Sequence, residues 1–340
     1  KNEMKTMSEK PEQMHDIATD RPLVTFTLFA YNHEECIRKS VEGAFTQTYE
    51  QLEIILSDDC SSDQTFEIIK EMAEAYDGPH RVVLNANPKN LGIGLHVNKL
   101  MGLSQGEIIV GAAGDDISHP DRVEKIVNKF LTKQERPFSV WSSAQYIDNQ
   151  GNELDQEFKK PSKSQTDTSM VRNFYPVIGA THAWDRRVFD FFGPLMPSIV
   201  FEDNAISFRS YLLGDIAFID EELVDYRTHT KNLTNFTKIS NSVELYFRAA
   251  TRIRWAIVGV DQRMRDLEFA INELGSIPRD QDLMRTELAT LKRKMTSRLE
   301  IYKSFPNISL RSLSKGLGDI LIMKAYVKSA IKITLNKLKL

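Results

Sequence analysis

Strand and helix patterns alternate along residues 23–133, and no other feature of the chain constrains its fold as much. Runs rich in β-branched and aromatic residues are separated by stretches in which apolar residues recur every three or four positions. The runs indicate strands over residues 23–30, 52–57, 81–85 and 107–112. Alternation of this kind predicts βαβ units, and therefore a parallel sheet with helices on both of its faces.

Helix-start signals lie between these predicted strands. In the first two gaps the signals are Asn32 with Glu35, which have the spacing of a capping box, and Ser61 with Gln64. A third helix is expected over 93–104, and Ser118 with Pro120 marks the start of a fourth.

The pattern changes after residue 134. Strands are predicted over 138–147 and 177–184, with a polar surface loop over 148–173 between them. A helix that begins with acidic residues and stops at Gly214 comes next. The segments that follow it are short strands at 216–219 and 223–227 and helices from about 240 to 300. We therefore expect an α/β domain followed by a helical region.

Two pairs of aspartates lie where two of the predicted strands end. Asp58 and Asp59 follow the second strand, and Asp115 and Asp116 follow the fourth. Ligands of open parallel sheets bind at the carboxyl ends of the strands. Because adjacent carboxylates repel each other and resist burial, a positively charged partner is expected near them.

Asp115 and Asp116 suit a hard divalent cation. Mg²⁺ and Mn²⁺ prefer oxygen ligands, and they commonly complete their shell with water and the phosphates of a substrate. The alternative is that the pair only caps the next helix, whose positive end favours acids. Ser118 is better placed for that capping.

The first aspartate pair has two interpretations as well. Asp58 and Asp59 could accept hydrogen bonds from a nucleobase or ribose, or they could only stabilise a turn in a loop rich in Ser and Asp. Tyr31, at the end of the first strand, could stack on a base, although a single tyrosine is more often a packed aromatic.

Charge is distributed unevenly along the chain. The formal net charge is -3, but residues 301–340 hold eight Lys or Arg and one acid, a local charge of +7, which leaves -10 for the other 300 residues. Within 316–340, Lys324, Lys328 and Lys332 form one stripe of a basic amphipathic helix. Such a helix suits an anionic membrane surface; packing against the protein body or a homo-oligomer contact through the C-terminal helices is the alternative.

The cellular setting is indicated by what the chain contains. Its two cysteines, Cys36 and Cys60, do not make a disulfide framework, so a reducing compartment is the default. No signal-peptide pattern is found, and no apolar run reaches the roughly 18 residues of a spanning helix. We expect a cytoplasmic protein, with peripheral attachment to the inner face of the cell membrane as the option that the basic tail adds.

Six short motifs, in order along residues 22–235, resemble those of the family-two glycosyltransferases of the GT-A fold, which invert the anomeric configuration of the transferred sugar. The motifs are Ala30-Tyr31-Asn32, "QTYEQLEIILSDDCSSD", "NLGIG", Gly114-Asp115-Asp116, Glu202-Asp203 and Tyr226-Arg227-Thr228-His229. The chain departs from the family pattern at Ala113, where the longer metal motif often begins with Asp, and at Val97, where an Arg is common.

The resemblance implies a role for individual residues. Tyr31 and Asp59 would hold the nucleotide base, uracil in a UDP-sugar donor, with Asp58 close by and Asn90 lining the donor site. Asp116 would ligate Mn²⁺ or Mg²⁺. The remaining roles would be donor contact by Asp115, diphosphate or metal contact by His229, and deprotonation of the acceptor hydroxyl by Asp203. For Asp203 the alternative is a helix N-cap.

The resemblance implies a fold and an activity. The fold is α/β, a Rossmann-like, mainly parallel mixed sheet flanked by helices, with an arm at 1–21, a catalytic domain at 22–235 and a helical region at 236–340. The activity is metal-dependent transfer of a hexose from a nucleotide-diphosphate donor to a glycan or lipid-linked saccharide, with no nucleic-acid partner. The rivals are a sugar-nucleotide pyrophosphorylase, which would need a Gly-rich basic loop where "AYNHEE" stands, and an inactive glycan-binding scaffold.

Overall fold

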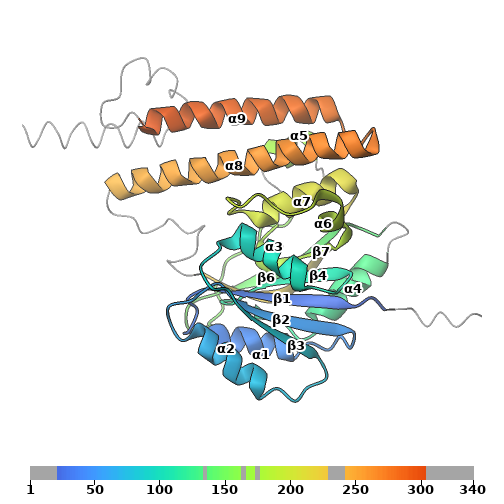
Figure 1. Cartoon of the computed structure of the whole chain (residues 1–340), viewed down its shortest axis with the longest axis vertical. Helices are drawn as coiled ribbons and strands as arrows, with labels where there is room; N and C mark the ends of the chain where they lie inside the picture. Colours follow the sequence, from blue (N-terminus) through green and yellow to red (C-terminus); the bar gives the residue numbers. More distant parts are fainter. Residues whose placement is uncertain (1–20, 133–135, 162–165, 173–176, 229–241, 304–340) are drawn as a thin grey trace, which may run out of the picture.

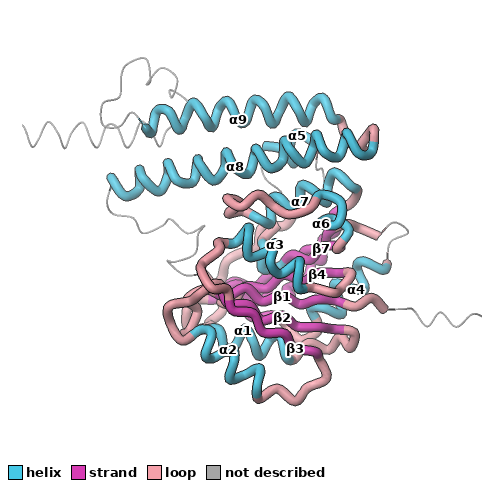
Figure 2. The backbone as a smooth tube through the Cα atoms, in the orientation of Figure 1, coloured by secondary structure: helices cyan, strands magenta, loops and turns pink. Residues whose placement is uncertain are grey.

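A mixed β-sheet forms the centre of the protein. The computed structural model describes residues 21–132, 136–161, 166–172, 177–228 and 242–303 (Figure 1). In this part of the chain the strands form one eight-stranded sheet in the order β3-β2-β1-β4-β7-β6-β8-β5. Helices pack against both faces, and the long helices α8 and α9 run side by side beyond α7 (Figures 1 and 2).

The first half of the sheet is parallel, as the alternating pattern predicts. Its strands are β1 (Val24–Ala30), β2 (Leu52–Asp58), β3 (Arg81–Ala86) and β4 (Ile108–Ala113). They are joined by α1 (Ile37–Phe45), α2 (Thr65–Glu74) and α3 (Ile93–Leu103). Ala30 pairs with Asp58 and Phe29 with Ala113, so the carboxyl ends of β1, β2 and β4 lie level at one edge.

The second half of the sheet has mixed direction. It consists of β5 (Ile117–Ser118), β6 (Ser139–Ile147), β7 (His182–Asp185) and β8 (Ile216–Arg227). β7 is antiparallel to both β4 and β6, whereas β6 and β8 are parallel. Two predictions are corrected here. The short strands at 216–219 and 223–227 are one strand, β8, whose pairing with β6 shifts register, and the strand predicted at 177–184 begins at His182, because Gly179–Thr181 form a 3₁₀ turn, η1.

The predicted helix starts were less accurate than the helices themselves. α1 begins at Ile37, so Asn32 and Glu35 do not form its capping box. Asn32 instead has a φ of 55° and binds the next loop, donating its N–H to Ser61 Oγ and accepting from the N–H of Ser62 through Oδ1. Tertiary contacts between two loops therefore displaced a local capping pattern.

The same correction applies to the fourth helix, α4 (Arg122–Leu131). Ser118 lies in β5, where its hydroxyl accepts a hydrogen bond of 2.8 Å from Arg122 Nη1, and it does not cap the helix. The apolar face of α4 is as predicted, since Val123, Ile126 and Phe130 are buried in the core under α1 and the parallel strands.

The remaining helices lie on the other side of the sheet or beyond it. They are α5 (Asp167–Arg172), α6 (Arg187–Phe192), α7 (Glu202–Leu213), α8 (Ser242–Leu274) and α9 (Gln281–Lys303). α5 lies within the polar segment 148–173 that was expected to be only a loop. Among the described helices, none is both long enough and apolar enough to cross a bilayer. Residues 1–20, His229 and the basic tail 316–340 lie outside the described residues.

Candidate active site

The end of β1 brings the two aspartate loops together. The N–H of Asp59 donates to the carbonyl of Ala30 at 2.9 Å, and the N–H of Gly114 donates to the carbonyl of Phe29 at 2.8 Å. The loop after β2 and the loop after β4 are therefore both held against the last two residues of β1. The structure thus places both predicted pairs at one rim of the sheet.

Asp58 is buried and is used within its own loop. Its two carboxylate oxygens accept hydrogen bonds from the N–H and the hydroxyl of Ser61. This is the turn-forming role that the Ser- and Asp-rich loop suggested as an alternative. Contact of Asp58 with a donor stays a prediction.

Asp59 holds the loop that contains Asn90. Its Oδ1 accepts from Asn87 Nδ2 at 2.8 Å and from the N–H of Leu91 at 2.9 Å, and its Oδ2 accepts from the N–H of Gly92 at 3.0 Å. Gly92 has a φ of +73°, a conformation that favours glycine. One carboxylate therefore shapes the loop that leads into α3 and places Asn90 at the rim.

Tyr31 is a large aromatic residue that is exposed at this rim. Its side chain is 45% exposed, at the end of β1 next to the buried Asp58 and Asp59. A packed core aromatic would be covered, so the packed alternative for Tyr31 is not what the structure shows. An exposed ring at the rim is available for stacking on a planar ligand.

A buried polar chain behind Asp59 was not foreseen from the sequence. His96 Nε2 and Ser57 Oγ lie 2.6 Å apart, Asn85 Nδ2 donates to both Ser57 Oγ and Asn87 Oδ1, and Asn87 donates to Asp59. Burial lowers the pKa of His96, although Asp59 and Asp58 oppose the shift. Polar residues at inward positions of β2 and β3 were the available signal.

Asp116 is the most enclosed acid of the rim. It is 5% exposed, and its Oδ1 accepts a hydrogen bond of 2.7 Å from the N–H of Arg227. Burial, and then the charge of Asp115, raises the pKa of Asp116 well above its ordinary value, in spite of Arg227 and Arg122. Burial and the same acids raise the pKa of Cys36 to about 11. Ionisation of Asp116 is therefore disfavoured unless a cation lies close to it.

Arg227 supports this loop through hydrogen bonds to its backbone. Its Nε donates to the backbone carbonyl of Asp115 at 2.8 Å, and its Nη1 donates to the carbonyls of Asp148 and Asn149. The guanidinium thus fixes the backbone of the second aspartate pair to the loop after β6. The sequence did not predict this role for Arg227, because the Tyr-Arg-Thr-His motif indicates a function only for His229.

The acids present fit part of a divalent-cation shell. In the described residues no three His, Cys, Asp or Glu side chains gather closely enough to hold a metal by themselves. Asp115 and Asp116 offer hard carboxylate oxygens in an electronegative rim, which suits Mg²⁺ or Mn²⁺ completed by water and phosphate oxygens. Capping of the next helix is not the role of this pair, because α4 starts at Arg122.

A third acid pair, Glu202 and Asp203, lies in the first turn of α7. Phe201 is the N-cap of this helix, so the N-cap alternative for Asp203 is wrong. Asp203 Oδ1 accepts from the N–H of Asn204 at 2.7 Å and from its side-chain amide at 3.0 Å. Burial raises the pKa of Asp203 to about 6, and burial together with the charge of Asp203 raises the pKa of Glu202 to about 8.

The η1 turn connects this pair to the sheet. A Cβ on Gly179 would lie 2.7 Å from Glu202 Oε1 and 3.7 Å from the Cβ of Asp203, so the turn packs directly against the first turn of α7, and a larger residue here would displace the Glu202 carboxyl group. The same turn contacts β4, the strand that leads to Asp115 and Asp116. His182 and Trp184 are buried in β7, so they are packed side chains and do not line a cleft.

The sequence of the sheet and its first helices matches a known family. Residues 26–189 match the model described as glycosyl transferase family 2. This segment is a family 2 glycosyltransferase domain. The family 2 resemblance inferred from the six motifs is thereby confirmed.

Relatives and solved structures agree with the assignment. Relatives with similar sequences include a chondroitin synthase of Escherichia coli, 30% identical over 52% of this chain and 25% of that protein. Another is the putative glycosyltransferase EpsE of Bacillus subtilis, 36% identical over 33% of this chain and 39% of that protein. The chain therefore spans well under half the length of these two relatives.

Similar folds are found in solved structures. A mannosyltransferase of Pyrobaculum calidifontis, solved in complex with GDP-Man and Mn²⁺, has a TM-score of 0.54 at 15% identity and covers 94% of this chain and 89% of its own. Residues 1–349 of S. aureus TarS, solved in complex with UDP-GlcNAc, have a TM-score of 0.50 at 15% identity and cover 90% and 92%. The family 2 domain and the helices after it thus have the predicted GT-A fold.

Proposed function

We propose that the protein is a metal-dependent, inverting glycosyltransferase. It transfers a sugar from a nucleotide-diphosphate donor, a UDP-sugar, to a hydroxyl of a glycan or lipid-linked saccharide in the synthesis of a surface polysaccharide. The observation that carries this proposal is the buried Asp116 beside Asp115, at the same rim as Tyr31 and the Asp59–Asn90 loop. Nucleotide sugars in the two solved relatives, one of them with Mn²⁺, support it.

The proposed donor site lies at the rim of the sheet. The exposed ring of Tyr31 stacks on the base, and Asp59 and Asn90 present the loop before α3 to the nucleotide. The carboxylate of Asp59 can accept about four hydrogen bonds, and three of these come from within the protein. It can therefore accept one more from the base. Asp58 stabilises the loop after β2, to which Asp59 belongs. Asp115 and His229 would make the contacts to the sugar and the diphosphate.

Asp116, with Asp115, would hold Mn²⁺ or Mg²⁺. Such an ion, when bound, supplies positive charge that stabilises the departing diphosphate. Both carboxylates must be ionised to ligate the ion. Because burial raises the pKa of Asp116, its ionised form would be favoured only when a cation is bound.

Asp203 is the proposed catalytic base. Inversion requires a base on the acceptor side, separate from the acids that hold the leaving group. Asp203 belongs to a different element from Asp116 and has a pKa of about 6, so it is ionised at neutral pH yet basic enough to accept the proton of a sugar hydroxyl. Glu202, with a pKa of about 8, stays protonated beside it.

Nucleotide release tests the proposal. UDP release from a panel of UDP-sugars is measured with and without Mn²⁺, together with UDP binding by calorimetry. Asp203→Asn is expected to lower transfer by about 10³-fold or more and to leave UDP binding intact, whereas Asp116→Asn is expected to abolish the effect of Mn²⁺. UDP binding without release from any donor would support the scaffold alternative, and loss of UDP binding in Asp203→Asn would assign Asp203 to the donor site.

A further inference from the structure

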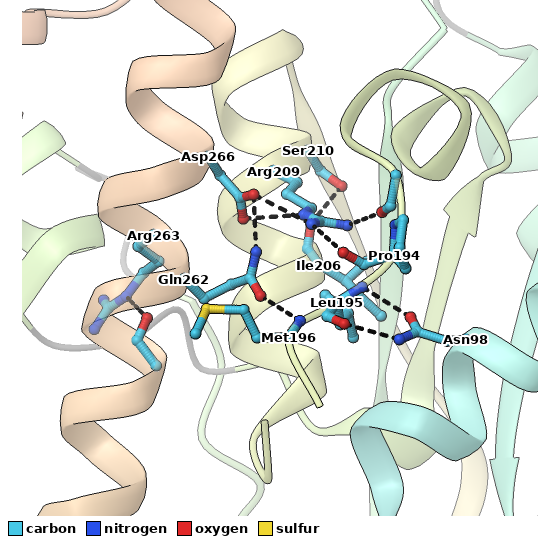
Figure 3. A network of polar contacts seen from close by, with 12 residues as sticks. Asn98, Pro194, Leu195, Met196, Ile206, Arg209, Ser210, Gln262, Arg263 and Asp266 are labelled. Atoms are coloured by element: carbon cyan, nitrogen blue, oxygen red, sulfur yellow. Dashed lines mark hydrogen bonds and ion pairs between the residues drawn. The ribbon is translucent and has the colours of Figure 1, made fainter. Parts of the chain in front are cut away.

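A buried ion pair joins the C-terminal helices to α7. Arg209 on α7 and Asp266 on α8 are 1% and 3% exposed, and two nitrogens of the guanidinium contact the two carboxylate oxygens at 3.0 and 3.1 Å. Arg209 also donates to the backbone carbonyls of Gly193 and Pro194, at 2.7 and 3.3 Å. One side chain therefore binds α8 and the loop that precedes α7 (Figure 3).

That loop, residues 193–201, is held from two further sides. Gln262 of α8 donates to Asp266 at 2.9 Å and accepts from the N–H of Met196 at 2.7 Å. Asn98 of α3 both donates to and accepts from the backbone of Leu195, each at 2.8 Å. Figure 3 shows these contacts as one network from α3 through the loop to α7 and α8.

The network lies between the two halves of the proposed site. α3 begins directly after the Asp59–Asn90 loop, and α7 begins with Glu202 and Asp203. Arg209 follows Asp203 by six residues in the same helix, so a rotation or shift of α7 at Arg209 is transmitted to its first turn. All four polar groups of the network are satisfied by each other or by backbone, as is needed for a buried polar network to impose one arrangement.

We infer that Arg209, Asp266, Gln262 and Asn98 are positioning residues, through which α8 sets the placement of Asp203 relative to the donor loop. This inference rests on the proposed function of Asp203. A buried ion pair is in general weak support for stability, and apolar replacements are often as stable. We therefore attribute the pair to fixing the position of α7 relative to α8, and not to a gain in stability.

The main test variant is Arg209→Met/Asp266→Leu in the full chain. Replacing both partners avoids a buried uncompensated charge, so the fold is expected to persist. Gln262→Leu is a second, milder variant that leaves the ion pair in place. The matched control is Arg285→Met/Glu268→Leu, which removes an exposed Arg–carboxylate pair of 2.7 Å between α8 and α9 that does not touch α7.

Hydrogen exchange gives the first readout, and it needs no substrate. The amides of Leu195 and Met196 are bonded to Asn98 and Gln262, so exchange over 194–205 is expected to be roughly tenfold faster in the main variant. Exchange over α1 and α2 is expected to be unchanged, and the control variant should match the wild type throughout. Unchanged exchange over 194–205 would overturn the inference whether or not the protein transfers sugar.

Transfer kinetics give the second readout. In the main variant, kcat is expected to fall by about 10- to 100-fold, while the affinity for UDP stays unchanged. The acidic midpoint of the pH profile of transfer is expected to move below 6, because Asp203 becomes more hydrated and its pKa falls. A purely structural role would lower the amplitude of the profile without moving its midpoint, and that result would overturn the positioning role. Wild-type protein that releases no UDP from any donor would overturn the proposed function separately, and the exchange result would still decide the coupling of α8 to α7.

Discussion

Glu202 and Asp203 are adjacent carboxyl groups in the first turn of α7, and burial raises the pKa of both. Asp203 has a pKa of about 6 and Glu202 a pKa of about 8. At pH 7 one is therefore ionised and the other is neutral. Such a separation, caused by burial and mutual repulsion, is how two similar side chains come to have different roles.

Transfer is expected to increase as pH rises through about 6, because Asp203 must lose its proton to act as a base. Glu202→Gln is expected to leave that midpoint nearly unchanged, since Glu202 is already neutral at pH 6. A pH series of initial rates for the two proteins measures this. A midpoint near 4 in both would show that the pKa of the base is not raised, which would contradict the prediction.

The same substitution has a predicted effect on stability. The folded pKa of Glu202 lies above its ordinary value, so the folded state holds the extra proton and loses stability as pH rises from about 5 through 8. Glu202→Gln removes this loss, and its Tm should exceed that of the wild type at pH 9 while matching it near pH 4.5. Each kcal/mol gained corresponds to roughly 2–4 °C in a chain of this size. Equal Tm values at pH 9 would contradict the prediction.

At the scale of elements, the buried polar chain joins three neighbours of the donor loop. His96 of α3, Ser57 of β2 and Asn85 of β3 share hydrogen bonds that end at Asn87 and Asp59. The shape of the donor loop therefore depends on polar groups inside the sheet–helix interface. A buried polar network whose hydrogen bonds are satisfied favours one arrangement of the groups around it.

Ser57→Val is expected to destabilise the protein by about 1–3 kcal/mol, because it leaves the buried His96 Nε2 without its partner and removes one of the two hydrogen bonds of Asn85 Nδ2. Urea unfolding measures the loss, and UDP binding should weaken in parallel. Ser104→Ala is the control. Ser104 is also buried, and its hydroxyl donates to the carbonyl of Leu100. That carbonyl also accepts a hydrogen bond from the N–H of Ser104, so it keeps a partner in the variant. A change of the same size in both variants would argue against a special role for the chain.

The η1 turn packs against the first turn of α7. Gly179→Ala places a Cβ 2.7 Å from Glu202 Oε1, so the Glu202 carboxyl group must rotate away, whereas the backbone of α7 can stay in place. We therefore expect transfer to fall by less than about tenfold. Gly102→Ala, in α3 where a Cβ meets nothing within 4 Å, should be neutral or stabilising by up to about 1 kcal/mol. Initial rates and thermal melts of both variants test this, and a much larger loss of transfer in Gly179→Ala would mean that the first turn of α7 is displaced.

At the scale of the whole molecule, the chain combines a family 2 domain with a helical region that is not a separate appendage. The family match ends at residue 189, before α7, yet α7 contributes Asp203 and is bonded to α8 through Arg209. The proposed active site is therefore complete only with elements beyond the matched segment.

The basic stripe of residues 316–340 predicts attachment to anionic membranes. The full chain should co-float with vesicles that contain phosphatidylserine and not with phosphatidylcholine alone, and the binding should weaken with salt. Lys324→Glu/Lys328→Glu/Lys332→Glu should abolish flotation, at about 1 kcal/mol for each cation removed. Equal flotation of the triple variant would remove the membrane prediction and favour packing or self-association of the tail.

The sequence by itself determined the features that depend on neighbouring residues. Period-two and period-3.6 patterns located β1 to β4, the helices between them and the buried face of α4, and the acids that follow β2 and β4 could be assigned to one rim because parallel strands end together. The six motifs were sufficient for the family.

Only the tertiary structure decided the features that depend on distant residues. The direction of β7, the late start of α1, the use of Asp59 to hold its loop, and the contact of Gly179 with Glu202 each join segments far apart in the chain. So does the Arg209–Asp266 pair, 57 residues apart. Local propensity is worth tenths of a kcal/mol per residue, whereas burying or pairing a polar group involves several, so the long-range contacts prevail where the two conflict.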